Sequence, residues 1–82
     1  SAASDVYKRQ NDDLINKKLG SKIIYLRKAK SYSQEKFAEK VNISTIYMSE
    51  IERGEANPTL EKLKNIADSL EVELVELFNF SF

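Results

Sequence analysis

A short polar stretch at residues 44–50 holds the side chains best suited to contact another molecule. It combines hydroxyl groups with one carboxylate: Ser44, Thr45, Tyr47, Ser49 and Glu50. Hydroxyl groups both donate and accept hydrogen bonds, and a carboxylate accepts them. No general base recognisably accompanies these groups, so they suit hydrogen bonding rather than covalent chemistry.

Two residue types that serve most catalytic and metal sites are missing. The 82 residues include no histidine and no cysteine, which excludes disulfides and thiolate metal sites and removes the commonest general base near neutral pH. The carboxylates are scattered along the chain. We therefore expect a protein that is not an enzyme and needs no metal or cofactor. No apolar run approaches the ~20 residues of a membrane span, and we expect a cytoplasmic protein without a membrane partner.

Helices must position the polar stretch, because apolar residues recur every three or four positions along the chain. A first helix is predicted over residues 13–29, with an apolar face of Ile15, Leu19, Ile23 and Leu26. Ser33 is the expected N-cap of a second helix, and Glu35 in its first turn complements the helix dipole. That helix buries Phe37, Ala38 and Val41.

The polar stretch itself is predicted to form a third helix. Ser44 caps it, Met48 and Ile51 face inward, and it ends at Gly54, which suits a left-handed backbone. Because so few residues separate the second and third helices, the two must cross steeply, as in a helix-turn-helix.

Two further helices complete a predicted all-α domain over residues 13–82. The fourth opens at Pro58-Thr59 and carries Leu60, Leu63, Ile66, Ala67 and Leu70. The fifth is short and carries Leu74, Leu77 and Phe78. No alternating apolar pattern indicates a strand.

Residues 1–12 show no periodicity and are predicted to be a disordered tail. Within them, residues 5–10 resemble the in-frame translation of a transposase end sequence used in DNA-library preparation. Under that interpretation the tail is an artefact and the natural protein begins near Asn11. We set this segment aside from the fold argument.

From Leu19 to Phe78 the sequence resembles the Cro/phage-repressor (XRE-like) helix-turn-helix family of DNA-binding transcriptional regulators. Three segments carry most of the resemblance: Ser33-Gln34-Glu35, Ile51-Glu52-Arg53-Gly54 and Asn57-Pro58-Thr59-Leu60. The resemblance implies a five-helix, lambda-repressor-like domain in which the second and third helices form the helix-turn-helix. In that arrangement the third helix enters the major groove of double-stranded DNA.

The resemblance also implies a role for particular residues. Base contacts fall on Thr45, Ile46 and Glu50. Contacts to the DNA backbone fall on Gln34, Tyr47, Ser49 and Asn57. A structural, partly buried ion pair is expected between Arg27 and Glu52.

Several of these residues have a plainer interpretation. Ile46 either contacts a thymine methyl or is incidentally exposed, and Glu50 either accepts from cytosine N4 or is a solvated charge. Gln34 could be an exposed helix residue, and Tyr47 could serve packing. For Arg53 a phosphate contact and a contact with the end of its own helix remain open.

Three turns depart from the family pattern. Ser31, Asn42 and Glu71 stand where the family often has glycine. Asparagine tolerates the left-handed region, whereas Ser and Glu do so less readily. We expect the turns to differ locally and the fold to survive.

The charges are distributed unevenly, although the formal net charge is zero. Residues 1–32 hold eight Lys and Arg against three Asp and Glu, and residues 33–82 hold five against ten. A neutral sum weakens a DNA-binding interpretation and favours its rival, a protein-interaction module that keeps the fold alone. The polar face of the third helix favours DNA.

We expect a sequence-specific transcriptional regulator, of repressor type, that binds a pseudo-palindromic operator as a homodimer. One small domain cannot easily bury all the aromatic residues at the C-terminus, which suggests a dimer interface formed by the fifth helix and the tail; the alternative is a tail that folds back on its own core. An antitoxin or a restriction-modification controller would use the same domain. A small-molecule effector is not expected, because there is no room for a separate ligand domain.

Overall fold

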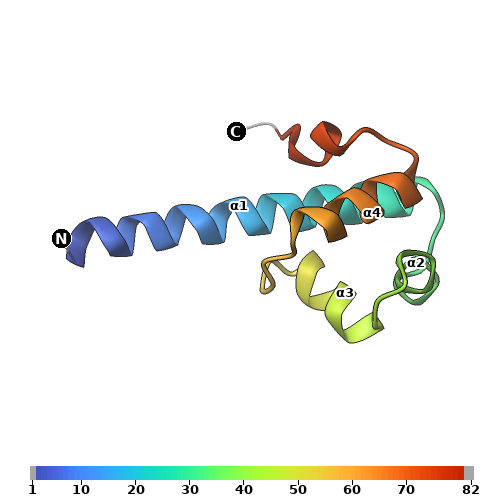
Figure 1. Cartoon of the computed structure of the whole chain (residues 1–82), viewed down its shortest axis with the longest axis horizontal. Coiled ribbons are helices and arrows are strands. Elements are labelled where there is room, and N and C mark those ends of the chain that lie inside the picture. The colour runs from blue at the N-terminus through green and yellow to red at the C-terminus, as the bar shows by residue number, and fades with distance from the viewer. Residues whose placement is uncertain (1, 81–82) are drawn as a thin grey trace.

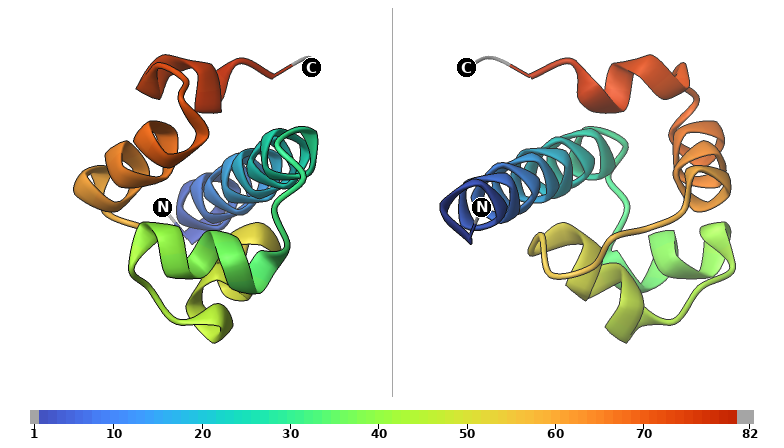
Figure 2. Two further views of the ribbon diagram at one scale, coloured as in Figure 1. Left: turned by 90° about the vertical axis from the view of Figure 1, so that its right-hand side faces the viewer. Right: turned by 60° about the vertical axis from the view of Figure 1, so that its left-hand side comes forward.

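The computed structural model describes the backbone of residues 2–80 and the side chains of residues 14–80. It contains α1 (Ala2–Ala29), α2 (Gln34–Val41), α3 (Thr45–Glu52), α4 (Leu60–Leu70) and a short 3-10 helix, η1 (Leu74–Phe78). All regular elements of the described residues are helical, which confirms the predicted class. In Figures 1 and 2, α2 and α3 lie on one side of α1, and η1 lies on the other.

Helix α1 begins earlier than expected, at Ala2 instead of about Asp13. The backbone of residues 2–12, predicted to lack regular structure, is therefore helical. These residues include neither glycine nor proline and several strong helix formers, so local propensity favours extending the helix. This part of α1 projects beyond the other elements (Figure 1). The boundary of the domain near residue 13 stays a prediction.

Capping side chains fix where α2, α3 and α4 begin. The hydroxyl of Ser33 accepts from the Lys36 amide at 3.0 Å, and that of Ser44 accepts from the Tyr47 amide at 3.0 Å. Thr59 caps α4 in the same way, at 3.2 Å from the Lys62 amide. Each bond satisfies an amide that has no partner within its helix. The expected starts at Ser33 and Ser44 are confirmed.

The turns where glycine is missing keep a left-handed backbone. Ser31, Asn42 and Glu71 have φ of 62°, 65° and 59°, and Gly54 has 76°. After α2 and α4 the left-handed residue lets the next amide reach back, from Ile43 to the Ala38 carbonyl and from Val72 to the Ala67 carbonyl, both at 3.0 Å. The expected local difference at these turns is therefore wrong. Closing the helix ends outweighs a cost of roughly 1 kcal/mol at Ser31 and Glu71.

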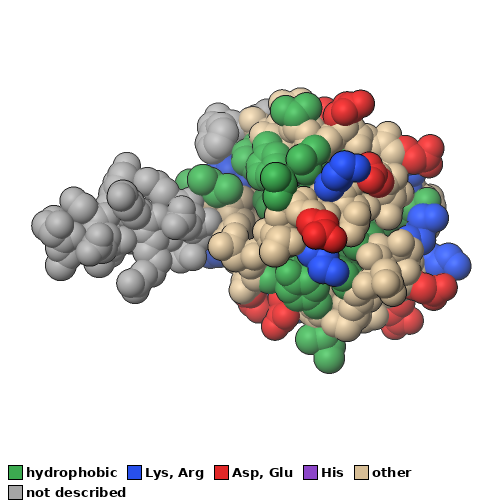
Figure 3. All heavy atoms as spheres, viewed as in Figure 1, with side chains coloured by type: hydrophobic (Ala, Val, Ile, Leu, Met, Phe, Trp, Pro, Cys, Tyr) green, Lys and Arg blue, Asp and Glu red, His purple; other side chains and the backbone are tan. Residues whose placement is uncertain are grey.

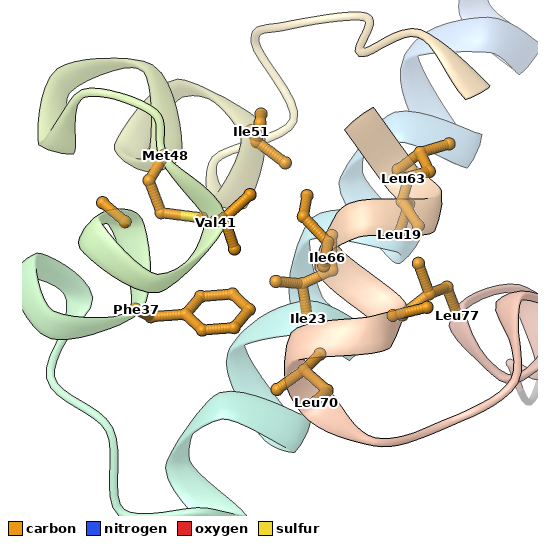
Figure 4. Packing of buried hydrophobic residues seen from close by; sticks show 12 residues of the cluster. Leu19, Ile23, Phe37, Val41, Met48, Ile51, Leu63, Ile66, Leu70 and Leu77 are labelled. Carbon is orange, nitrogen blue, oxygen red and sulfur yellow. The ribbon is translucent and has the colours of Figure 1, made fainter. Parts of the chain in front are cut away.

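The core lies between α1, α2, α3 and α4, with η1 closing one side (Figure 4). It confirms most of the predicted apolar faces, including Leu19, Ile23, Phe37, Met48 and Ile51. Ile15 and Leu60 were predicted on those faces but are exposed. Ile15 is 45% exposed, and Leu60, the first residue of α4, is 68% exposed.

The C-terminal segment packs partly on the domain itself. Leu77 is fully buried, and Phe80 packs against the core. Phe78 remains 40% exposed and meets Phe80 edge to face at 6.3 Å between ring centroids. Lys22 of α1 and Glu76 of η1 form an ion pair at 3.0 Å. Folding back therefore accounts for Phe80 but leaves part of Phe78 uncovered; Phe82 lies outside the described residues.

None of the helices in the described part of the chain is both long and apolar enough to cross a membrane.

Candidate nucleic-acid interface

A buried ion pair joins α1 to the end of α3. Arg27 Nε donates to Glu52 Oε2 at 2.8 Å, and Arg27 Nη2 donates to Glu52 Oε1 at 3.1 Å. The third guanidinium nitrogen, Nη1, donates to the Tyr32 carbonyl at 2.9 Å. Two parallel charge-assisted bonds fix both the distance and the relative orientation of the side chains. The pair implied by the family resemblance is thus present, and it holds α3 against α1.

Glycine at position 20 allows this close approach. A Cβ built on Gly20 would lie 2.5 Å from the Glu52 carbonyl oxygen and 2.6 Å from that of Ile51. Any side chain would push the end of α3 away from α1. The position of α3 therefore depends on the Arg27–Glu52 ion pair and on the close approach of the Gly20 backbone to the end of α3.

Gln34, at the start of α2, is attached to the same carboxylate. Its Nε2 donates to Glu52 Oε1 at 3.0 Å. The bond uses one N–H of the amide, which leaves its second N–H and its oxygen for another partner. Gln34 is half-buried, so Glu52 orients it rather than leaving it a freely exposed surface residue.

The outward side of α3 carries the three predicted base-contacting residues. Thr45 and Ile46 are exposed, Ile46 by 75%, and Glu50 is half-buried. Ile46 is separated from the core that Met48 and Ile51 enter, as the sequence predicted. A shallow hollow of about 400 Å³ adjoins this side of α3 and is lined by Gln34, Thr45, Ile46, Ser49 and Arg53.

The predicted backbone contacts lie in different surroundings. Ser49 lines the hollow together with Gln34, so the structure brings these two together. Asn57 is exposed in the loop between α3 and α4. Tyr47 is half-buried and packs against the core, so at least part of its ring serves packing.

Arg53 lines the hollow as well, and the sequence left two roles open for it, a phosphate contact and a contact with the end of its own helix. It follows α3 directly, and its Nε and Nη2 donate to Glu55 Oε2 and Oε1 at 3.1 Å and 3.0 Å. Its Nη1 donates to the Ser49 hydroxyl. The hydrogen bond with Glu55 raises the pKa of Arg53 and lowers that of Glu55. Only the side-chain contacts, which the sequence does not show, place Arg53 beside Gln34 and Ser49.

A second hollow, of about 420 Å³, lies between α1 and the C-terminal segment. Its lining is basic and partly aromatic: Lys17, Lys18, Ser21, Lys22, Tyr25, Asn79 and Phe80. The C-terminal segment lies on the opposite side of α1 from α3 (Figure 2). Most of this hollow therefore lies away from the outward side of α3.

Hydrophobic side chains gather near the point where α1 leaves the compact part of the molecule, and charges of both signs are interspersed elsewhere on that face (Figure 3). Among the residues with described side chains, the exposed large hydrophobic ones outside α3 and α4 are Leu14, Ile15, Tyr25, Val75 and Phe78. The described residues contain no cluster of acidic side chains that could hold a metal ion.

A steeply crossed helix pair with a capped, outward-facing second helix defines a helix-turn-helix DNA-binding domain. The model of the helix-turn-helix family matches residues 23–77. The chain therefore belongs to this family, that of the Cro/C1-type (XRE) transcriptional regulators.

Among its relatives, the transcriptional regulator SlrR of Bacillus subtilis (strain 168) is 44% identical over 62 residues, which span 74% of this chain and 41% of SlrR. The control protein C.MunI of a Mycoplasma species is 40% identical over 63 residues, 76% of this chain and 85% of that protein. The immunity repressor of Bacillus phage phi105 is 36% identical over 56 residues, which span 39% of the repressor. The chain thus covers less than half of two of these relatives and most of the third.

The fold is also similar to that of solved regulators. The restriction-modification controller C.AhdI of Aeromonas hydrophila superposes with a TM-score of 0.74 at 35% identity, over 76% of this chain and 94% of the controller. A helix-turn-helix transcriptional regulator from Vibrio cholerae gives a TM-score of 0.76 at 30% identity, over 82% of this chain and 38% of that one.

Proposed function

We propose that this domain binds a specific sequence of double-stranded DNA and represses transcription as a homodimer on a pseudo-palindromic operator. The observation that carries the proposal is the exposure of Thr45 and Ile46 at the start of α3, next to an oriented Gln34. An apolar side chain that is 75% exposed beside a hydroxyl suits the edge of a base pair better than it suits water.

The contacts divide into two kinds. Thr45, Ile46 and Glu50 distinguish base pairs: a hydroxyl bonds to base edges, isoleucine meets a thymine methyl, and a carboxylate accepts from cytosine N4. Gln34, Ser49 and Asn57, with the exposed part of Tyr47, hold the sugar-phosphate backbone and set the register. The first amides of α3 add partial positive charge at the same end.

The exposed apolar residues on the side of α1 away from α3 support the proposed dimer. Tyr25, Val75 and Phe78 are exposed there by 68%, 74% and 40%. In the proposed dimer, two copies of α3 contact one face of the duplex. The half-sites then lie about one helical turn, roughly 34 Å, apart.

The test is a selection of bound duplexes from a random DNA pool, followed by a salt titration with the selected sequence. We expect an enriched pseudo-palindrome and an affinity that falls steeply between about 50 and 200 mM salt. No enrichment, or an affinity that does not change with salt, contradicts DNA binding and favours a protein-interaction module. Light scattering with and without DNA tests the dimer, and a monomer at high concentration in both states contradicts it.

A second candidate, control of a restriction-modification system, is supported by one observation. The chain spans 85% of C.MunI and 94% of C.AhdI, a control protein and a restriction-modification controller. This second function predicts the same contacts on DNA as the first. A methyltransferase gene beside the gene for this chain would support it, and a toxin gene there would favour an antitoxin instead.

A further inference from the structure

Arg53 is held by two residues at the rim of the hollow that adjoins α3. Glu55 accepts from its Nε and Nη2 at 3.1 Å and 3.0 Å, and Ser49 accepts from its Nη1. A guanidinium has five N–H groups. Three are occupied in this arrangement, and two on the terminal nitrogens remain to donate elsewhere.

The partners of the hollow indicate what Arg53 could contact. Gln34 and Ser49 line it with Arg53, and both are proposed contacts to the DNA backbone. A guanidinium matches the two oxygens of a phosphate with parallel hydrogen bonds. A phosphate that reaches Gln34 and Ser49 would therefore lie beside Arg53.

Glu55 opposes this contact. Its carboxylate occupies the Nε–Nη2 edge of the guanidinium, which is an edge that can bind a phosphate with two parallel hydrogen bonds, and it adds a negative charge next to DNA. The pair is open to solvent, with side chains 53% and 59% exposed. Exposed ion pairs contribute little to stability, so a phosphate can displace Glu55 without disturbing the fold.

We propose that Arg53 is a further contact to the DNA backbone, and that Glu55 restrains it, so that binding exchanges the Glu55 carboxylate for a phosphate. The inference rests on the proposed DNA binding. It assigns Glu55 the role of lowering affinity for all DNA sequences alike, while Thr45 and Ile46 determine which sequence is preferred.

The experiment is a double-mutant cycle of wild type, Arg53→Gln, Glu55→Gln and the double variant. Binding is measured by fluorescence anisotropy across salt, with the selected duplex and with a scrambled duplex. We expect Glu55→Gln to tighten binding to both by roughly threefold to tenfold without changing the log–log salt slope, because Arg53 contacts a phosphate in both proteins. Arg53→Gln, which loses that contact, is expected to lower the slope by about 0.9. In the Arg53→Gln background, Glu55→Gln is expected to give a clearly smaller gain.

Glu73→Gln is the matched control, because it removes the same charge at the start of η1, away from α3. Thermal unfolding by circular dichroism checks that all variants fold. Equal gains from Glu55→Gln in both backgrounds would show simple charge repulsion and overturn the exchange. A loss of affinity, or a response like that of Glu73→Gln, would overturn it too. If the wild type shows no salt-dependent binding, the proposed function itself fails instead.

Discussion

Gln34 donates a hydrogen bond of 3.0 Å to Glu52 Oε1. The same carboxylate oxygen accepts from Arg27 Nη2. A side chain proposed to hold DNA is thereby linked to the ion pair that holds α3 on α1. The start of α2 and the end of α3 are thus tied at one carboxylate. The hydrogen bonds that position α3 therefore also orient Gln34, a proposed DNA contact.

Replacing Gln34 by alanine is expected to weaken binding to every DNA sequence and leave the fold intact. One hydrogen bond to phosphate is lost, which corresponds to about 1 kcal/mol, or roughly fivefold in affinity. Anisotropy with the selected and the scrambled duplex measures this. Lys36→Ala, an exposed α2 residue, serves as the control, and a loss confined to the selected duplex would contradict a backbone role.

Breaking the buried ion pair is expected to cost far more stability than breaking a surface pair. Arg27→Met leaves the Glu52 carboxylate buried without its cation, which costs on the order of 3–5 kcal/mol in the free energy of unfolding. Lys64→Met removes the exposed pair with Asp68 and should cost less than about 1 kcal/mol. Urea unfolding of both variants makes the comparison, and similar losses would show that the Arg27 pair is not a structural tie.

Thr45→Ala and Ile46→Ala are expected to change sequence preference without lowering the melting temperature. Both side chains are exposed, so neither supports the core, whereas each lost base contact corresponds to roughly 1–3 kcal/mol of discrimination. Repeating the selection from a random pool with each variant checks this. Leu60→Ala provides the control, since Leu60 is also apolar and 68% exposed but starts α4. An unchanged selected sequence for both α3 variants would remove them from the base-contacting set.

Gly20→Ala is expected to destabilise the domain although it adds a single methyl group. That methyl would lie 2.5 Å from the Glu52 carbonyl oxygen, and relieving such overlap costs about 1–3 kcal/mol. Because the displaced element is α3, DNA affinity should fall even where the variant is still folded. Thermal unfolding and anisotropy measure the two effects. Ser21→Ala, one residue along α1 and exposed, should change neither.

Periodicity and capping were enough to predict most of the fold. Ser33 and Ser44 start their helices as expected, and Phe37, Met48 and Ile51 are buried. The spacing of apolar residues does not predict burial where it cannot show whether another element packs on that face of the helix. Ile15 continues an apolar stripe but is exposed, and the predicted fifth helix is a 3-10 helix.

Some contacts of the candidate site were predicted from the sequence, and others were not. Family resemblance placed Arg27 with Glu52, and the spacing around Met48 predicted an outward Ile46. The hydrogen bond from Gln34 to Glu52 and the ion pair of Arg53 with Glu55 depend on how side chains from different segments are oriented. Spacing along a chain does not determine that geometry, so neither contact could be predicted from the sequence.

The left-handed turns at Ser31 and Glu71 leave this domain room for engineering. Glycine at each position would relieve roughly 1 kcal/mol of backbone strain, and Glu71→Gly would give up only an exposed pair with Lys30. Neither residue lines the hollow beside α3. Heat tolerance could thus be raised without altering the residues that are proposed to contact DNA.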